Sequence, residues 1–242
     1  MAPSKMQYQR VLLKLGGESL AGEHAFGIDQ DAVASVATRV VAAHKLGVEL
    51  AVVVGGGNFW RGGENKHINR ATADYIGMLG TVMNAMALQE AIERLDVPTR
   101  VQTAIEMREI AEPYIRRKAM AHLQDGRIVI FAAGSGNPYF TTDTAGALRA
   151  MEIGADAFLK ATKVDGIYTE DPMVNPNASR IKQITYLDAI NNGIKVLDAT
   201  AFSLCMDNNM PIVVFRLEDT GSLVHVLEGA RIGTLVSAEP ND

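Results

Sequence analysis

Short apolar runs rich in β-branched residues alternate along this chain with longer segments of helical periodicity. The runs at 11–13, 48–54 and 127–133 are apolar almost throughout and show no regular polar alternation. Strands of that kind are typical of a parallel sheet that helices cover on both faces. We therefore expect an α/β fold, a three-layer αβα sandwich around a mostly parallel twisted sheet.

The elements follow one another without a flexible linker, an internal repeat or a low-complexity segment. Apolar runs predict strands at 11–13, 48–54, 98–102, 127–133, 157–160, 211–215 and 232–236. Periodicity and helix-ending glycines predict helices at 31–46, 78–95, 107–124, 144–153, 186–191, 199–208 and 222–227. The stretch 171–177 holds two prolines and predicts an extended loop. We expect one domain over residues 1–242.

The helix through 78–95 carries two apolar stripes. One stripe holds Met78, Val82, Ala85, Leu88, Ile92 and Leu95, and the other holds Leu79, Met83 and Met86. A helix that is apolar on more than one face is either buried on two sides or in contact with a second copy of the chain. The sequence leaves both alternatives open.

Composition limits the kinds of partner and the cellular compartment that we expect for this protein. The net charge of −5 argues against long nucleic acids and anionic membranes, but a small anion such as a nucleotide can still find a locally positive pocket. The single cysteine, Cys205, cannot form an internal disulfide, which suits a reducing compartment. The first residues lack a signal-peptide pattern, and no apolar run reaches the roughly 18 residues of a membrane span. We expect a cytoplasmic protein.

Three predicted strands end in glycine-rich turns. The turns contain Gly16-Gly17, Gly55-Gly56-Gly57 and Gly134-Ser135-Gly136. In a doubly wound sheet, ligands bind beyond the carboxyl ends of the strands, where glycine lets backbone amides approach a phosphate. A single turn of this kind is ordinary strand-to-helix structure. Three turns at neighbouring strand ends predict one site for a long anionic chain.

Several familiar signatures are missing. No P-loop motif occurs, and Gly55-x-Gly57 lacks the third glycine of the dinucleotide fingerprint, which disfavours a redox cofactor. The five histidines have no metal-ligand spacing, so we expect no metal held by the protein alone. The nucleophile elbow of acyl transferases is also absent. Cys205 lies among apolar neighbours and is expected to serve packing.

Two basic residues flank the glycine turns. Phosphoryl transfer depends on positioning and charge stabilisation more than on covalent chemistry. Lys14 ends an apolar strand beside the first turn, where its ammonium can bridge donor and acceptor phosphates. Alternatively its stem lies on the sheet and its head in solvent. Arg61 follows the second turn and suits a bidentate phosphate contact, or is a solvent-facing loop residue.

Other candidates have a structural and a functional interpretation. Asp143 stands at a predicted helix start, where it caps the helix or lies near the phosphates and holds Lys14 or the magnesium shell. Asp74 precedes an apolar helix and is either a cap or the acceptor of two ribose hydroxyls. In the polar segment 160–172, Lys163 can reach donor phosphates and Tyr168 can lie against a purine ring.

Four motifs occur together. They are Leu-Leu-Lys-Leu-Gly-Gly-Glu at 12–18, Gly-Gly-Gly-Asn-Phe-Trp-Arg-Gly at 55–62, Gly-Asn-Pro-Tyr-Phe-Thr-Thr-Asp at 136–143 and Thr-Lys-Val-Asp-Gly at 162–166. Their combination resembles bacterial uridylate kinases, a branch of the amino-acid-kinase superfamily, from about residue 10 to residue 236. The motifs at 55–62 and 136–143 are the ones more specific to the uridylate kinases.

The resemblance implies a carbamate-kinase-like fold and transfer of the ATP γ-phosphoryl group to UMP, with Mg²⁺ carried by ATP. This reaction supplies UDP for pyrimidine nucleotide (CTP) biosynthesis. The implied catalytic residues are Lys14 and Asp143. The implied ATP-binding residues are Lys14, Leu15, Gly16, Gly17, Gly57, Arg61, Thr162, Lys163, Tyr168 and Asp171. The implied UMP-binding residues are Gly56, Asp74, Ser135, Gly136, Asn137, Pro138, Tyr139, Phe140, Thr141 and Thr142.

The resemblance also implies an acceptor lobe over about 1–155, an ATP lobe over about 156–242, and a homohexamer that GTP activates and UTP inhibits. Gly16 stands where many relatives carry serine, which removes a hydroxyl contact but keeps the backbone amide. Gln89 and Glu90 differ from the arginine and aspartate of some relatives in the effector region. Arg100 and Arg127 match that region.

Two other functions are disfavoured. A kinase for a carboxylate or carbamate has no need of the polar, aromatic-flanked loop 135–142, which suits a planar base. A non-catalytic nucleotide-binding or oxyanion-storage protein has less need of Lys14, Lys163 and Asp143 together, which would clamp two phosphates in line.

Overall fold

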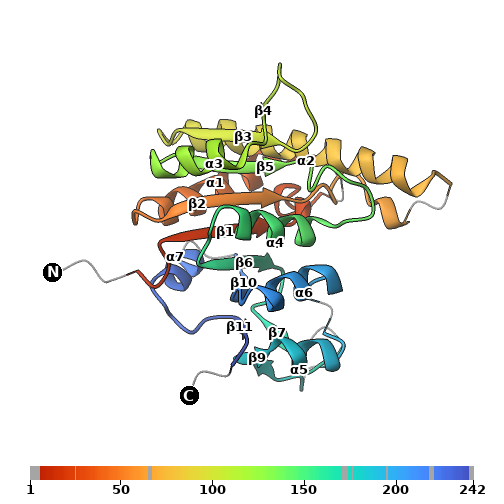
Figure 1. Cartoon of the computed structure of the whole chain (residues 1–242), viewed down its shortest axis with the longest axis vertical. Helices are drawn as coiled ribbons and strands as arrows, with labels where there is room; N and C mark the ends of the chain where they lie inside the picture. The colour runs from red at the N-terminus through yellow and green to blue at the C-terminus, as the bar shows by residue number, and fades with distance from the viewer. Residues whose placement is uncertain are drawn as a thin grey trace.

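A computed structural model describes residues 6–24, 26–64, 67–170, 174–175, 177–194, 196–217 and 221–239. The central sheet has nine strands: β1 (Arg10–Leu15), β2 (Glu49–Val54), β3 (Thr99–Thr103), β4 (Glu112–Pro113), β5 (Ile128–Ala132), β6 (Ala157–Thr162), β9 (Gln183–Thr185), β10 (Ile212–Arg216) and β11 (Thr234–Ser237). They run in the order β4-β3-β5-β2-β1-β6-β10-β11-β9 (Figure 1), and every neighbouring pair except β10–β11 is parallel. A separate antiparallel pair joins β7 (Ile167–Tyr168) to β8 (Arg180–Ile181).

Helices cover both faces of the sheet. They are α1 (Gln30–His44), α2 (Arg70–Glu93), α3 (Arg116–Gln124), α4 (Thr142–Glu152), α5 (Tyr186–Asn191), α6 (Ala199–Asp207) and α7 (Ser222–Leu227), with 3₁₀ turns η1 (Gly17–Leu20) and η2 (Gly62–Glu64). In β1, Val11 and Leu13 pack into the core beneath α1, α2 and α7, while Leu12 packs beneath α3 to α6. Successive strand residues face opposite sides, so strands covered twice must be apolar throughout. The expected mostly parallel, three-layer α/β fold is confirmed.

The strands that lead into the glycine turns are neighbours in the sheet. β5, β2 and β1 lie side by side, with β6 next to β1. Leu15 is in register with Val54, and the amide of Gly55 donates to the carbonyl of Leu15 at 2.8 Å. The three turns therefore start at the carboxyl ends of adjacent strands in the middle of the sheet.

Most predicted elements agree with the structure to within two residues at each end, but the helix expected over 107–124 is wrong in its first half. Only α3 is helical there, and Glu112 and Pro113 form the edge strand β4 beside β3. Proline has no amide hydrogen and disfavours helical geometry in the residue before it, so an edge strand accommodates both residues better than a helix interior. Of the predicted loop 171–177, residues 171–173 and 176 lie outside the described residues.

Helix α2 begins at Arg70, well before the stripes that predicted it. Five residues of its first apolar stripe are buried against the sheet: Met78, Val82, Ala85, Leu88 and Ile92. The second stripe is uncovered in the single chain: Leu79, Met83 and Met86 are 49%, 46% and 44% exposed. Within the described residues, no helix is both long and apolar enough to cross a membrane.

The edge strand β4 is tied to α3 through Glu112. Its carboxylate accepts from Gln102 at 3.2 Å and lies 2.9 Å from His122 Nε2 and 3.1 Å from Lys118 Nζ. Burial alone would raise the pKa of Glu112, but these three partners outweigh it and lower the pKa to about 2. The ionised carboxylate is thus favoured in the folded state.

We expect acid to weaken the protein partly through Glu112. Its folded pKa lies below the unfolded value of 4.5, so its contribution is complete above about pH 4.5 and is lost as the pH falls toward 2. Glu112→Gln should remove about 1–3 kcal/mol of this pH-dependent stability, after a discount for partial exposure. Urea unfolding between pH 6 and pH 3 measures it. Exposed Glu109→Gln is the control, and an unchanged pH dependence in Glu112→Gln would contradict the assignment.

Candidate active site

Two lysines and one aspartate meet near the carboxyl ends of the central strands. Lys14 Nζ lies 2.9 Å from Asp143 Oδ1, and Lys160 Nζ lies 2.5 Å from Asp143 Oδ2. The lysines are register partners in β1 and β6, and Asp143 lies in the first turn of α4. All three side chains are only 12–13% exposed. One carboxylate thus joins two ammonium groups, and the cluster keeps a net positive charge.

The two lysines determine the ionisation state of Asp143. Burial alone would raise the pKa of Asp143, but Lys14 and Lys160 outweigh burial and lower it. The carboxylate is therefore ionised at neutral pH and is a weak base. Burial also lowers the pKa of Lys160, against the attraction of Asp143, and Lys160 donates to the carbonyl of Val196.

The first two glycine turns touch each other and α2 through their backbones. A Cβ atom on Gly17 would lie 2.8 Å from the carbonyl oxygen of Gly55 and 2.9 Å from the amide nitrogen of Gly57. A Cβ atom on Gly56 would lie 2.4 Å from the carbonyl oxygen of Gly77 in α2. Backbone cannot move aside as a flexible side chain can, so both positions require glycine.

Buried polar residues of α2 hold the turns in place. Asn84 Nδ2 donates to the Gly55 carbonyl at 2.7 Å, and the Asn84 and Asn58 amides bond each other reciprocally at 2.7 and 3.0 Å. Thr81 Oγ1 accepts from the amide of Ala133 at 2.7 Å, just before the third turn. Sequence analysis missed these residues, although polar residues at buried positions of an apolar helix are a readable signal.

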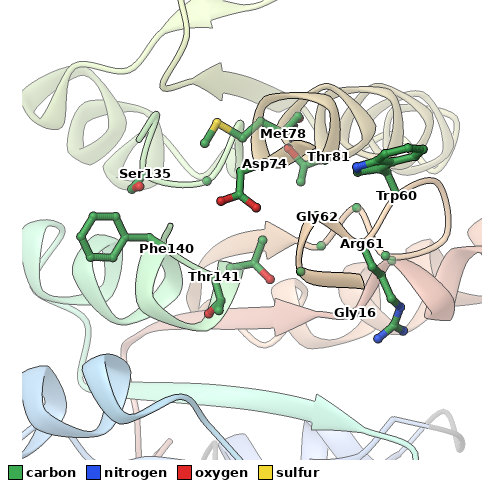
Figure 2. Close-up of a pocket in the computed structure, with 18 of the residues that line it drawn as sticks. Gly16, Trp60, Arg61, Gly62, Asp74, Met78, Thr81, Ser135, Phe140 and Thr141 are labelled. Carbon is green, nitrogen blue, oxygen red and sulfur yellow. Dashed lines mark hydrogen bonds between the residues drawn. The ribbon is translucent and has the colours of Figure 1, made fainter. Parts of the chain in front are cut away.

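Two cavities adjoin at the Lys14 cluster. The first, of about 320 Å³, lies between the three turns and the start of α2 (Figure 2). The second, of about 430 Å³, lies between η1, α1 and the end of β6. Lys14, Gly16 and Glu18 line both cavities. A group held in one cavity can therefore face a group held in the other across the Lys14 ammonium.

Most residues predicted to bind UMP surround the first cavity. Those that line it are Gly56, Asp74, Ser135, Phe140, Thr141 and Thr142. In Figure 2 the Asp74 carboxylate points into the cavity. The other predicted residues, Gly136 to Tyr139, complete the loop: Gly136 packs on Ala104, the Asn137 amide hydrogen bonds Ser135, and the Tyr139 amide donates to Asp74 at 2.8 Å.

The residues predicted to bind ATP are divided between the cavities. Thr162 and Lys163 line the second cavity. Gly17, Gly57 and Arg61 line the first, and Arg61 Nη2 lies 3.9 Å from the Glu18 carboxylate that both cavities share.

Two of the remaining predicted residues do not line either cavity, and a third cannot be placed. Leu15 is buried in the core, and it reaches the turns only through its backbone. The Tyr168 hydroxyl donates to Asp165 at 2.6 Å, and neither cavity's lining includes Tyr168. Asp171 lies outside the described residues.

Three residues near the site were not predicted. Lys160 interrupts an apolar strand as Lys14 does, and that pattern could have marked it. Glu18 lines both cavities. Asp198 caps α6 and accepts from the hydroxyls of Thr141 and Thr144, so it joins α6 to the start of α4.

The structure also bears on cysteine chemistry and on metal binding by clustered side chains. Cys205 is buried in α6, and burial together with Asp198 raises its pKa to about 12, so the expected packing role is confirmed. Among the described residues, no three His, Cys, Asp or Glu side chains gather as metal ligands do.

Comparisons with known proteins agree with this geometry. Residues 9–216 match the model of the amino acid kinase family. The chain is 56% identical to a uridylate kinase of Pediococcus pentosaceus over 239 residues, which are 98% of this chain and 99% of that protein. The UMP kinase structure from Bacillus anthracis superposes with a TM-score of 0.93 at 37% identity, covering 96% of this chain and 97% of that one. The one from Ureaplasma parvum gives 0.89 at 35%, covering 96% and 100%. The chain therefore belongs to the amino acid kinase family and, within it, to the uridylate kinases.

Proposed function

We propose that this protein transfers the γ-phosphoryl group of ATP to UMP, giving ADP and UDP for pyrimidine nucleotide biosynthesis. The observation that carries the proposal is the meeting of two cavities at Lys14, whose ammonium lies against the Asp143 carboxylate that also binds Lys160. A phosphoryl transfer needs its donor and acceptor in line across a positive centre. The names of the similar proteins supply UMP as the acceptor.

In this proposal UMP occupies the first cavity. Asp74 holds the ribose, and the loop 135–142 surrounds uracil and phosphate. The first turn of α4 begins at Thr142 beside this cavity, and its helix dipole favours the acceptor phosphate. Because every lining residue of the cavity precedes residue 155, the assignment of 1–155 as acceptor lobe is retained.

ATP occupies the second cavity, with its triphosphate directed at Lys14. Thr162 and Lys163 flank the phosphates there, and Gly16 offers its backbone amide at the boundary. Residues on both sides of 155 line this cavity, so the ATP lobe over 156–242 shares its site with η1 and α1. We retain Gly57 and Arg61 for ATP at the boundary, where the γ-phosphoryl group would enter the first cavity.

The protein groups act by charge and position. Lys14 contacts the transferring group, and ionised Asp143 fixes the directions of Lys14 and Lys160. No general base is required, because the phosphate of UMP is already anionic at neutral pH. Glu18 lines both cavities, so its carboxylate would hold the Mg²⁺ carried by ATP or one of its waters, and the ion would offset phosphate charge there.

A panel of acceptors tests the activity directly. With ATP and Mg²⁺, UMP should give ADP and UDP, while CMP and acetylglutamate should be poor acceptors because the loop 135–142 is built around uracil. A coupled assay of ADP release measures turnover. Turnover with another acceptor and none with UMP would overturn the proposal.

Lys14→Ala should lower kcat by about 10²–10³-fold or more, the cost of removing a preorganised charge from a transferring group. The fold should persist, since Asp143 keeps Lys160 as a partner. Kinetics with UMP and circular dichroism measure both effects. Lys45→Ala, an exposed lysine at the end of α1, is the control. A Lys14→Ala variant with near-normal kcat would remove Lys14 from the catalytic role.

We also propose a cytoplasmic homohexamer with GTP and UTP as effectors. Gln89 and Arg100 of the effector region line an outer cavity of about 470 Å³ together with Arg108 and Lys118. The uncovered second stripe of α2, with Tyr75 also 44% exposed, supports contact with another copy, because large adjoining apolar groups are unfavourable in water.

The oligomer can be tested through that stripe. The wild type should scatter light as a hexamer at micromolar concentration. Leu79→Glu with Met83→Glu should yield smaller species, because a buried unpaired charge opposes association. Lys45→Glu on α1 is the control. A stable wild-type monomer would contradict the proposed assembly.

A further inference from the structure

Arg70, the first residue of α2, contacts the carboxylate that the proposed function assigns to ribose. Its Nε lies 2.9 Å from both carboxylate oxygens of Asp74, one helical turn further on. Arg70 also lines the first cavity. It was not among the residues that the sequence singled out.

Helix stability does not account for this pair. The amino end of a helix carries a partial positive charge, so a cation at its first position is unfavourable. The order Arg followed by Asp is also the less favourable orientation of such a pair. The Arg70 side chain is 47% exposed, and solvent screening leaves an exposed ion pair worth little. The arrangement has a local cost and is better explained by what it does in the cavity.

The Asp74 carboxylate is held on three sides. Besides Arg70, the backbone amide of Tyr139 donates to Oδ2 at 2.8 Å. A Cβ atom on Gly62 would lie 2.3 Å from Oδ1, so the backbone of η2 closes the third side. The side chain of Asp74 is only 11% exposed. These contacts leave the carboxylate a single direction, into the cavity (Figure 2).

Arg70 also contacts the opposite wall. Its guanidinium carbon lies 5.9 Å from the centre of the Tyr139 ring, within the range of a cation–π contact. Tyr139 has a φ of 73°, a conformation that costs a non-glycine residue about 1–2 kcal/mol, and its side chain is 65% exposed. Burial therefore does not hold this part of the loop. The contacts with Asp74 and Arg70 do.

We propose that Arg70 is a positioning residue for the acceptor nucleotide. It orients Asp74 toward the ribose hydroxyls, and it offsets the negative charge of Asp74 in a cavity that must admit an anionic phosphate. Through Tyr139 it also keeps the base-binding loop against α2. This inference rests on the proposed function and adds a specificity element for the sugar.

Arg70→Gln keeps much of the side-chain length and removes the charge. We expect it to raise KM for UMP roughly 10-fold or more, the cost of a lost charged hydrogen bond, and to leave KM for ATP unchanged. The kcat at saturating UMP should stay within about 3-fold, because the Lys14 cluster is untouched. Arg70→Lys should restore little, since a lysine has no Nε–H to share between the two oxygens.

The ribose supplies the decisive comparison. With the 2′-deoxy and 3′-deoxy forms of UMP, wild type should lose affinity for the form that lacks the hydroxyl bound by Asp74. With that form, Arg70→Gln should raise KM severalfold less than it does with UMP, because the ribose contact that Arg70 positions is missing and only its effects on charge and on the loop remain. An equal increase for UMP and both deoxy forms would overturn the proposal, as would an unchanged KM for UMP or full rescue by Arg70→Lys.

Arg94→Gln is the matched control. Arg94 caps the carboxyl end of the same helix, and its Nε lies 3.0 Å from Glu90 in another pair spaced by one turn, outside the first cavity. It should leave KM for UMP unchanged, and thermal unfolding of both variants reports on folding. A wild type that does not use UMP would defeat the proposed function, whereas a wild type that uses UMP without any dependence on Arg70 would defeat only this inference.

Discussion

The bridge from Asp143 to Lys14 and Lys160 is the interaction on which the site depends. A carboxylate buried at the centre of a sheet edge is strongly destabilised unless opposite charges accompany it. The two ammonium groups supply that compensation, and the excess positive charge remains available to phosphates. Because Lys14 belongs to β1, Lys160 to β6 and Asp143 to α4, the same contacts fix two strands and a helix at the boundary between the cavities.

Backbone contact gives the cavities their walls. Gly17 and Gly56 are required because the turns after β1 and β2 approach each other and α2 more closely than any side chain allows. Thr81 and Asn84 then satisfy turn groups that would otherwise be buried without partners. Glycine therefore serves close packing first, and the exposed amides that can meet a phosphate are a consequence of that packing. A mildly acidic chain forms a site for anions in this way without a large basic surface.

The first cavity combines rigid and adjustable parts. The glycine turns that line it are held by buried hydrogen bonds. Asp74, by contrast, is held by the partly exposed side chain of Arg70 and by the amide of Tyr139. A substrate that hydrogen bonds to Asp74 would meet an already oriented carboxylate. Preorganisation of this kind improves binding because the ordering cost is met during folding.

The sequence by itself determined the alternation of strands and helices and the glycine turns, and it marked Lys14 as a candidate, because these depend on local periodicity and on chemistry beside a strand end. It could not assign β4, where pairing at the sheet edge decided the conformation of Glu112 and Pro113. It also left Asp143 as either a cap or an ion partner, and missed Lys160 and Arg70. Only the tertiary structure decided those roles, because strand register and the packing of α2 and α4 on the sheet bring together charges that are distant or ambiguous along the chain.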